Sequence, residues 1–265
     1  MSSNVEFLAG VLAEAQRKRV NVVLVQHDDD DPEEDWLEQF TARTTSAVIA
    51  LSSALSHSQQ KQLEAQGVRL VVVNPQDSPH LGAPSVGATN WAGGVTAARH
   101  LVELGHQRIA MLAGPDDSLV ARARLSGYRD ALDAAKLPVD EELIVPGTFD
   151  YESGLVQALH VLALPQRPTA IFAASDRQAM GVIEAARQLS LRVPQDVSVV
   201  GFDDLAAAAM TAPPLTTIRQ PLNDMGAIAL AMALTLIENR PLFSRDTELA
   251  TSLVVRGSTA PPGTD

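Results

Sequence analysis

No cysteine occurs in the 265 residues of this chain, and this absence excludes disulfide bonds and thiolate metal sites. The chain also lacks any apolar run near the roughly 20 residues that a membrane-spanning helix requires. Its first residues show no basic segment followed by an apolar one, so the sequence predicts no secretory signal. These absences favour a cytoplasmic protein with no membrane partner.

Basic residues are scarce. The chain has 20 Lys and Arg against 32 Asp and Glu, which gives a formal net charge of −12. A surface that binds DNA by itself needs a basic patch to displace counterions from the phosphates, and no basic cluster stands out in the sequence. A hydrophobic content of 46% still allows an ample core, for one large domain or two smaller lobes.

Residue types that serve catalysis or metal binding are scattered. We find no HExxH pair, no Walker-type loop and no nucleophile–base arrangement, and therefore expect no enzyme activity, metal or cofactor. One exception is the acidic run HDDDDPEEDW at 27–36. It fits either a divalent-metal site or a helix start, with Asp31 as N-cap and Pro32 in the first helical position. We favour the helix start.

The stretch Thr169–Asp204 indicates how the chain is organised. Residues 170–174 form an uninterrupted apolar run, typical of a parallel sheet that is covered on both faces. Ser175 follows where a helix needs an N-cap, and apolar residues then recur at helical spacing. The next apolar strand spans Val197–Phe202. The pattern predicts a right-handed βαβ unit, in which ligands lie beyond the carboxyl ends of the strands.

Strands alternate with helices along the rest of the chain, which indicates parallel α/β sheets. The other expected strands are Asn21–Val25, Ala47–Leu51, Val68–Val73, Ser85–Ala88, Arg108–Ala113, Leu143–Val145, Thr216–Arg219 and 248–255. The other expected helices are 5–19, His57–Gln66, 92–104, 119–136, 152–163 and 223–238.

Several motifs resemble the LacI/GalR family of bacterial sugar-responsive repressors, in family order and at family spacing. They are SVGATNWAGG (85–94), HLVELGHQRIAMLAGP (100–115), ARLSGYRDAL (123–132), RPTAIFAASD (167–176), VPQDVSVVGFDD (193–204) and PPLTTIRQP (213–221). The resemblance implies a two-lobed, periplasmic-binding-protein-like type I fold. Each lobe would be a doubly wound parallel sheet flanked by helices.

The same resemblance implies how the chain divides. Residues 1–89 and 221–246 would form the N-terminal lobe, and residues 90–220 and 247–258 the C-terminal lobe. Residues 259–265 are expected to be a disordered tail. The chain would thus cross between the lobes near 89, 220 and 247, and crossings at one seam make a hinge through which a ligand changes the lobe angle.

Two family features are missing. The first expected helix begins almost at Met1, so the strand that should precede it is absent, and so is the helix-turn-helix head that binds operator DNA in the family. In flavodoxin-like order that first strand lies centrally, and its loss would leave two unpaired strand edges. We expect a shortened version of a longer protein, or a start at a misassigned position. A complete five-stranded first sheet would contradict this expectation.

The resemblance carries the family's main effector contacts to two residues. Arg124 matches an arginine that binds effector oxygens, and its planar fork of donors suits vicinal hydroxyls or a carboxylate. Asp203 matches an acid that accepts hydrogen bonds from the effector. The alternatives are a surface helix arginine and an N-cap for residues 204–210. We favour effector binding for both residues.

Further ligand-binding candidates follow from the same comparison. Asn74 ends the strand 68–73, where the family often has aspartate. Ser175 replaces a frequent asparagine and is either a contact or only a helix cap. Phe149 falls where an aromatic ring commonly stacks on the ligand, with core packing as the alternative. The remaining candidates are Gln220, which would orient groups at the hinge, Ser118, and Ser3 or Asn4.

The sequence therefore predicts the effector-binding and dimerisation domain of a transcriptional regulator, with a sugar or sugar derivative bound between the lobes. Homodimer contacts are expected at helix 57–66, around helix 179–189 and at Thr216–Pro221. Operator DNA would be bound only through the missing head. One alternative is a free-standing sugar-binding receptor for transport or chemotaxis, and another is an α/β enzyme that acts on a sugar or nucleoside.

Overall fold

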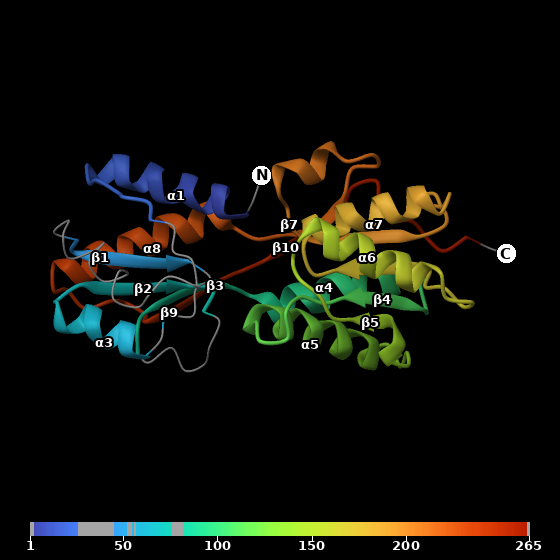
Figure 1. The fold of residues 1–265 in the computed structure, drawn as a ribbon, viewed down its shortest axis with the longest axis horizontal. Coiled ribbons are helices and arrows are strands. Elements are labelled where there is room, and N and C mark those ends of the chain that lie inside the picture. Colours follow the sequence, from blue (N-terminus) through green and yellow to red (C-terminus); the bar gives the residue numbers. More distant parts are fainter. Residues whose placement is uncertain (1–2, 26–44, 52–54, 56, 76–81, 264–265) are drawn as a thin grey trace. The chain divides into compact units, whose positions relative to one another are not determined.

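The computed structural model describes residues 3–25, 45–51, 55, 57–75 and 82–263. The chain divides into two compact units (Figure 1). The larger unit comprises Thr89–Gln220 and Ala250–Asp265, and the smaller unit comprises Ser2–Ala88 and Pro221–Leu249. Both are built from parallel strands and helices, so the predicted α/β class is confirmed. Because the chain passes between the units more than once, each unit is assembled from separate stretches of sequence.

The larger unit contains a six-stranded sheet in the order β10-β8-β7-β6-β4-β5, in which only β10 is antiparallel to its neighbour. Its strands are β4 (Ile109–Leu112), β5 (Ile144–Val145), β6 (Ala170–Ala173), β7 (Ser198–Asp203), β8 (Thr216–Arg219) and β10 (Ser252–Val254). Its α-helices are α4 (Asn90–Glu103), α5 (Leu119–Ala134), α6 (Tyr151–Leu162) and α7 (Asp176–Gln188), and its 3-10 helices are η1 (Glu141–Leu143) and η2 (Ala206–Met210).

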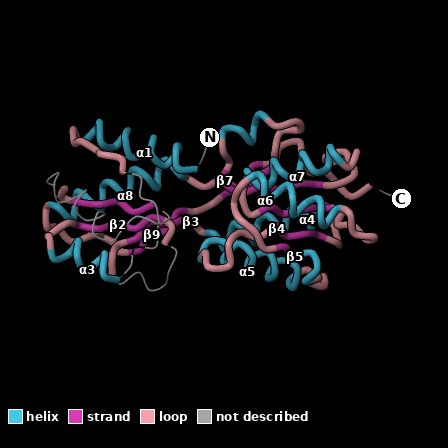
Figure 2. The backbone as a smooth tube through the Cα atoms, in the orientation of Figure 1, coloured by secondary structure: helices cyan, strands magenta, loops and turns pink. Residues whose placement is uncertain are grey.

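Helices cover both faces of this sheet (Figure 2). Successive side chains of a strand point to opposite faces. Ile171 and Ala173 of β6 belong to the core under α6 and α7, whereas Ala170 and Phe172 belong to the core under α4 and α5. All four residues are fully buried, which explains why the strand is apolar throughout. The doubly wound arrangement expected for this unit is therefore present.

A glycine contact sets the distance between α4 and α5. A Cβ atom added at Gly94 of α4 would lie 2.3 Å from the backbone oxygen of Arg124 on α5, and one at Gly127 of α5 would lie 2.2 Å from the backbone oxygen of Trp91. Real Cβ atoms essentially never come this close to another heavy atom. The two helices can therefore touch backbone to backbone only because these positions lack side chains, and this contact fixes where α5 carries Arg124.

The described residues of the smaller unit form a four-stranded parallel sheet in the order β1-β2-β3-β9. The described strands are β1 (Ala47–Leu51), β2 (Arg69–Val73), β3 (Ser85–Ala88) and β9 (Asp246–Leu249), and the described helices are α1 (Ser3–Lys18), α3 (His57–Ala65) and α8 (Leu222–Ile237). Helix α8 packs on β1, β2 and β3, and α1 packs on α8. Gly10 of α1 and Gly226 of α8 allow the backbones of these two helices to approach closely.

Two of the predicted strands are corrected by the structure. Asn21–Val25 is not a strand, and Val23 and Leu24 are 63% and 71% exposed. Among the described strands none pairs with this segment, and an apolar segment without a ladder partner cannot form a sheet. The predicted single strand 248–255 is instead two strands, because β9 belongs to the smaller sheet and β10 to the larger. The last passage between the units thus falls at Ala250 rather than at 247. The acidic run at 27–36 lies outside the described residues.

The expected disordered tail is also corrected, for its described part up to residue 263. Ser258 is fully buried, and its hydroxyl donates to the Val199 carbonyl at 2.6 Å. Ala260 exchanges two hydrogen bonds with the hydroxyl of Ser198, at 2.9 and 3.0 Å. Its carbonyl also lies 2.9 Å from Nε2 of the buried His106. These partners satisfy the backbone of the segment, so it packs against the larger sheet.

None of the helices in the described ranges is long and apolar enough to cross a membrane. Within the same ranges, no group of three or more His, Asp or Glu side chains is arranged to hold a metal ion.

Candidate functional site

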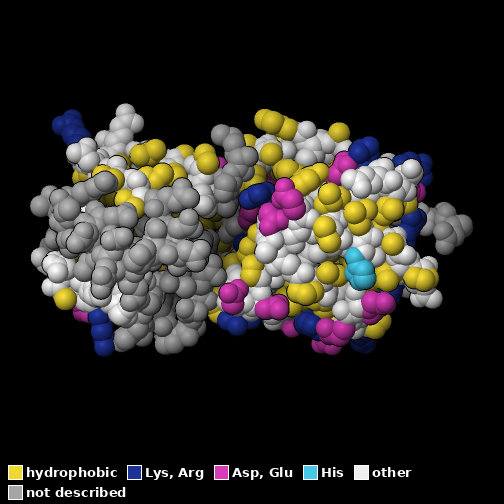
Figure 3. All heavy atoms as spheres, in the orientation of Figure 1, with side chains coloured by type: hydrophobic (Ala, Val, Ile, Leu, Met, Phe, Trp, Pro, Cys, Tyr) yellow, Lys and Arg dark blue, Asp and Glu magenta, His cyan; other side chains and the backbone are white. Residues whose placement is uncertain are grey.

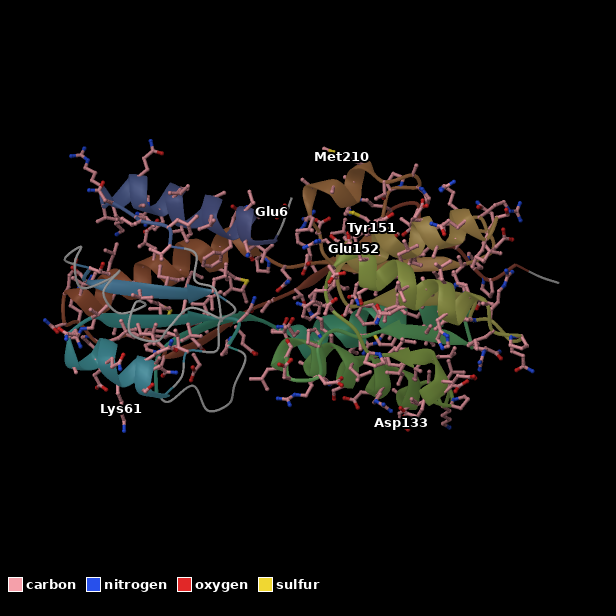
Figure 4. All side chains as sticks on the ribbon, viewed as in Figure 1. Glu6, Lys61, Asp133, Tyr151, Glu152 and Met210 are labelled. Atoms are coloured by element: carbon pink, nitrogen blue, oxygen red, sulfur yellow. The ribbon has the colours of Figure 1, made fainter. Side chains whose placement is uncertain are left out.

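Polar residues gather at the carboxyl edge of the larger sheet. Ser175 follows β6, Asp203 ends β7, and Gln220 follows β8. Tyr151 and Glu152, which are labelled in Figure 4, mark the first turn of α6, just after the loop that carries Phe149. Parallel strands bring their carboxyl ends to one edge, and this edge is where open α/β sheets bind ligands. The sheet therefore places several of the predicted residues together.

Arg124 is held inside this group. Only 4% of the residue is exposed. Its Nε donates to Oδ1 of Asn90 at 2.9 Å, and its Nη1 donates to the Ala174 carbonyl at 2.6 Å. Nη1 also lies 3.9 Å from Oδ1 of Asp203. Among the described residues none accepts a hydrogen bond from Nη2, so this nitrogen can serve a bound molecule.

Two aromatic rings flank the guanidinium of Arg124. Its central carbon lies 3.8 Å from the centroid of the Phe202 ring and 5.4 Å from that of Phe149. Burial lowers the pKa of Arg124 to about 10, while the nearby carboxyl groups of Asp203 and Asp176 act in the opposite direction. Arg124 therefore keeps its positive charge at neutral pH. It is not the surface helix arginine of the alternative interpretation, because its guanidinium is buried and held between the two rings.

Asp203 and Gln220 form a second part of the site. The side-chain Nε2 of Gln220 donates to Oδ1 of Asp203 at 2.6 Å, and the Gln220 backbone N–H donates to the Asp203 carbonyl at 3.2 Å. The Asp203 residue is 8% exposed. Oε1 of Gln220 is buried and has no hydrogen-bond partner among the described residues. Because an unpaired buried acceptor is costly, this oxygen suits a hydroxyl or amide donor of a ligand.

Ser175, Ser118 and Phe149 have structural roles as well. The Ser175 hydroxyl accepts from the backbone N–H of Gln178 as the N-cap of α7, and it donates to the Phe149 carbonyl at 2.9 Å. Ser118 is 2% exposed and is the N-cap of α5. The Phe149 ring lies against Gly114, where an added Cβ would be 2.4 Å from the ring. Both caps thus fix elements that carry Arg124 and Phe149.

The remaining predicted residues lie in the smaller unit. Asn74 follows β2 with a positive φ of 49°, and within the described part of the chain its buried Oδ1 has no hydrogen-bond partner. Asn4 is exposed in the first turn of α1, and Ser3 begins that helix. The orphaned Asn74 oxygen is, like that of Gln220, an acceptor that a ligand could satisfy.

Sequence reasoning missed three residues of this site: Asn90, Phe202 and Asp176. Asn90 orients the Arg124 guanidinium, and Phe202 supplies the closer aromatic face. Asp176 is fully buried, and its Oδ2 accepts from the Leu205 backbone N–H at 2.7 Å. Burial and then the neighbouring Asp203 raise the pKa of Asp176 well above its usual range. All three lie inside motifs that resemble the LacI/GalR family, but only the tertiary contacts show what each residue does.

The arrangement combines one available cationic donor, acceptors on Asp203 and Gln220, and the partly buried ring of Phe149, whereas Phe202 is fully buried beneath Arg124. Aromatic faces suit the C–H face of a sugar ring, and the polar groups suit its hydroxyls. Arg124 is already matched by the carboxyl group of Asp203. Within the described part of this unit, the site therefore fits an uncharged, hydroxyl-rich molecule better than an anion, which would need an unmatched cation.

The fold and this site define a periplasmic-binding-protein-like domain, and residues 98–259 match the family described as "Periplasmic binding protein-like domain". The chain is 33% identical over 264 residues to the HTH-type transcriptional regulator DegA of Bacillus subtilis (strain 168), covering 96% of this chain and 78% of DegA. It is 32% identical over 227 residues to the HTH-type transcriptional repressor CytR of Escherichia coli (strain K12), covering 86% of this chain. It spans 66% of the length of CytR.

Among solved structures, the transcriptional regulator CelR–cellobiose complex is similar with a TM-score of 0.89 at 31% identity, covering 97% of this chain and 79% of that one. The chain belongs to the LacI/GalR family of transcriptional regulators and corresponds to its effector-binding core. Both expectations from the sequence motifs, the family and the type I fold, are confirmed. These relatives are named as regulators rather than as enzymes.

Proposed function

We propose that this chain is the effector-binding and dimerisation core of a sugar-responsive transcriptional regulator. The effector is a neutral sugar or sugar derivative, bound at the carboxyl edge of the larger sheet. Arg124 donates to its hydroxyls, Asp203 and Gln220 accept from them, and Phe149 lies along the ring. Asn74 is a further proposed contact, because its buried Oδ1 has no hydrogen-bond partner among the described residues. The observation that carries this proposal is the buried Arg124–Asp203 pair beside the unpartnered oxygen of Gln220.

The mechanism is a population shift. The effector favours one angle between the units, and a homodimer transmits this angle to a DNA-binding head in the whole protein. Dimer contacts involve α3, the region around α7, and β8 with the residues that follow it. The described residues on the face shown in Figure 3 present no continuous basic patch, which supports DNA binding through a separate head rather than through this core. Such a regulator acts in the cytoplasm.

A thermal-shift panel of neutral sugars, nucleosides and their phosphorylated counterparts tests the proposal. At least one neutral compound should raise the melting temperature, since a ligand that binds only the folded state stabilises it by mass action. Its phosphorylated counterpart should stabilise less. Chromatography of the incubated compounds should reveal no product, and a new product would support the enzyme alternative. Sedimentation velocity with and without the effector tests the dimer.

The matched pair D-glucose and D-glucose 6-phosphate illustrates the contrast, because both are pyranoses and differ only in one phosphate. A phosphate brings nearly two negative charges, and Arg124 is already matched by Asp203. A panel in which only phosphorylated compounds stabilise the protein would contradict the neutral effector. A panel with no stabilising compound at all would argue against the sugar class as a whole.

A further inference from the structure

The end of β7 adopts an unusual backbone conformation. Asp203 has a φ of 120° and Asp204 a φ of 60°, so two consecutive residues with side chains lie in the left-handed region. Residues other than glycine rarely adopt this region, and it persists only where the surrounding structure holds it. The turn gives Asp203 its direction towards Arg124, so whatever holds the turn also sets the geometry of the site.

The Asp204 carboxylate is bound on both sides by arginines. Its Oδ2 lies 2.6 Å from Nε of Arg219, and its Oδ1 lies 2.5 Å from Nη2 of Arg256. Only 7% of the Asp204 side chain and 18% of the Arg256 side chain are exposed, so water screens this pair less than the pair with Arg219, whose side chain is 55% exposed. Arg256 is itself anchored, because its Nη1 donates to the Leu215 carbonyl at 2.7 Å.

The two arginines come from different parts of the larger unit. Arg219 ends β8 and is in register with Asp203 of β7, one residue before Gln220. Arg256 follows β10, on the stretch that re-enters the unit at Ala250. The chain leaves the larger unit just after Arg219, at Gln220, and it re-enters this unit at Ala250, shortly before Arg256. Asp204 therefore connects the turn with two segments that lead from one unit to the other.

Two backbone N–H groups beside the same turn donate hydrogen bonds. The Leu205 N–H donates to Oδ2 of Asp176 at 2.7 Å, just after the turn, and the Gln220 N–H donates to the Asp203 carbonyl at 3.2 Å. Both bonds lie directly beside residues 203 and 204, so opening of the left-handed turn should break them. Hydrogen exchange of the two N–H groups therefore measures whether the turn is held.

We propose that Asp204 is a positioning residue, which together with Arg219 and Arg256 clamps the left-handed turn and keeps the Asp203 carboxylate facing Arg124. The role of the clamp in effector binding rests on the function proposed above for Asp203. The clamp itself is a property of the larger unit, which can be measured without any sugar.

The test compares Asp204→Asn with the matched control Asp196→Asn. Asparagine tolerates the left-handed region, so the first substitution removes the charge without forcing the backbone to change. Asp196 pairs with Arg192 on the surface of the same unit, at 2.8 Å. Amide hydrogen exchange at Leu205 and Gln220 should become about tenfold faster in Asp204→Asn. The NMR signal of the Arg124 Nε–H should also shift, because Asp203 moves beside it.

In Asp204→Asn, the amides of β6 should exchange at the rate of the original protein. In Asp196→Asn, all amides should do so. Unchanged exchange at Leu205 and Gln220 would overturn the clamp, and so would an equal acceleration at β6, which would indicate general loosening. If Asp204→Asn does not fold, Arg219→Gln replaces it, because the Arg219 side chain is 55% exposed. That variant should accelerate exchange at Gln220, and no acceleration would again reject the proposal. A failed sugar panel leaves this result untouched.

Discussion

The guanidinium of Arg124 stacks on the ring of Phe202, with 3.8 Å between the guanidinium carbon and the ring centroid. Phe202 immediately precedes Asp203, so one short segment of β7 provides both the aromatic support and the carboxylate for the same cation. A planar, delocalised cation is suited to this position, because it stacks on a ring and still directs donors sideways. The relationship leads directly to a prediction about effector binding.

Replacing Arg124 with lysine should weaken effector binding about tenfold or more. Lysine keeps the charge but loses the fork, so it cannot bind Asn90, Ala174 and an effector together. Isothermal titration with a compound that stabilises the original protein measures the change. The control is Arg129→Lys, because Arg129 is partly exposed on the same helix and pairs with Glu141. Equal affinities of both variants would remove Arg124 from the site.

Replacing Asp176 with asparagine should flatten the dependence of stability on pH. The folded state raises the pKa of Asp176, mainly through burial. A raised folded pKa favours the protonated form, so the associated stability is fully present below the unfolded pKa near 3.9 and is lost as pH rises through the folded pKa. Asparagine resembles the protonated form and does not titrate. The free energy of unfolding, measured in urea, should therefore fall more between pH 5 and pH 8 for the original protein than for Asp176→Asn.

Asp196→Asn serves as the control for this prediction as well. Its hydrogen bonds with Arg192 lower the pKa of Asp196, so this group stays ionised throughout pH 5 to 8. Substitution there should leave the slope of stability against pH unchanged. A slope that is equally steep in Asp176→Asn would show that Asp176 is not protonated in the folded protein.

Replacing Gly94 with alanine should destabilise the larger unit by about 1–3 kcal/mol or more, because the added methyl group overpacks the α4–α5 contact. The new Cβ would lie 2.3 Å from a backbone oxygen, which cannot move aside as a flexible side chain can. Gly87→Ala is the matched control, since its nearest contact would be an ordinary 3.9 Å. Denaturant midpoints of the two variants provide the comparison, and similar values would contradict the close contact.

Shortening the chain after Ser258 should lower the melting temperature. It removes the hydrogen bonds that Ala260 forms with Ser198 and His106, and it uncovers the part of the larger unit on which the segment packs. A chain that ends at Gly263 is the control, because it keeps every one of these bonds. If both chains melt at the same temperature, the tail contributes nothing to stability.

The sequence alone determined the family and the fold class. Apolar runs of strand length alternate with segments in which apolar residues recur at helical spacing. Both patterns can be recognised from neighbouring residues alone. The same patterns indicated which strand ends carry polar groups, whereas the candidates Arg124, Phe149, Ser175, Asp203 and Gln220 came from the resemblance of the motifs to the LacI/GalR family. The structure shows that these residues lie close together within one unit. Their contact with an effector remains a prediction.

Only the tertiary structure decided which residues are partners. No local pattern shows that Asn90 would hold Arg124, that Asp204 would bind arginines 15 and 52 positions away, or that residues after Ser258 would pack rather than fray. Nor could the segment at Asn21–Val25 reveal that it would lack a ladder partner. Strand propensity and capping are properties of neighbouring residues in sequence. Hydrogen bonds, ion pairs and burial depend on which distant groups the folded sheet brings together.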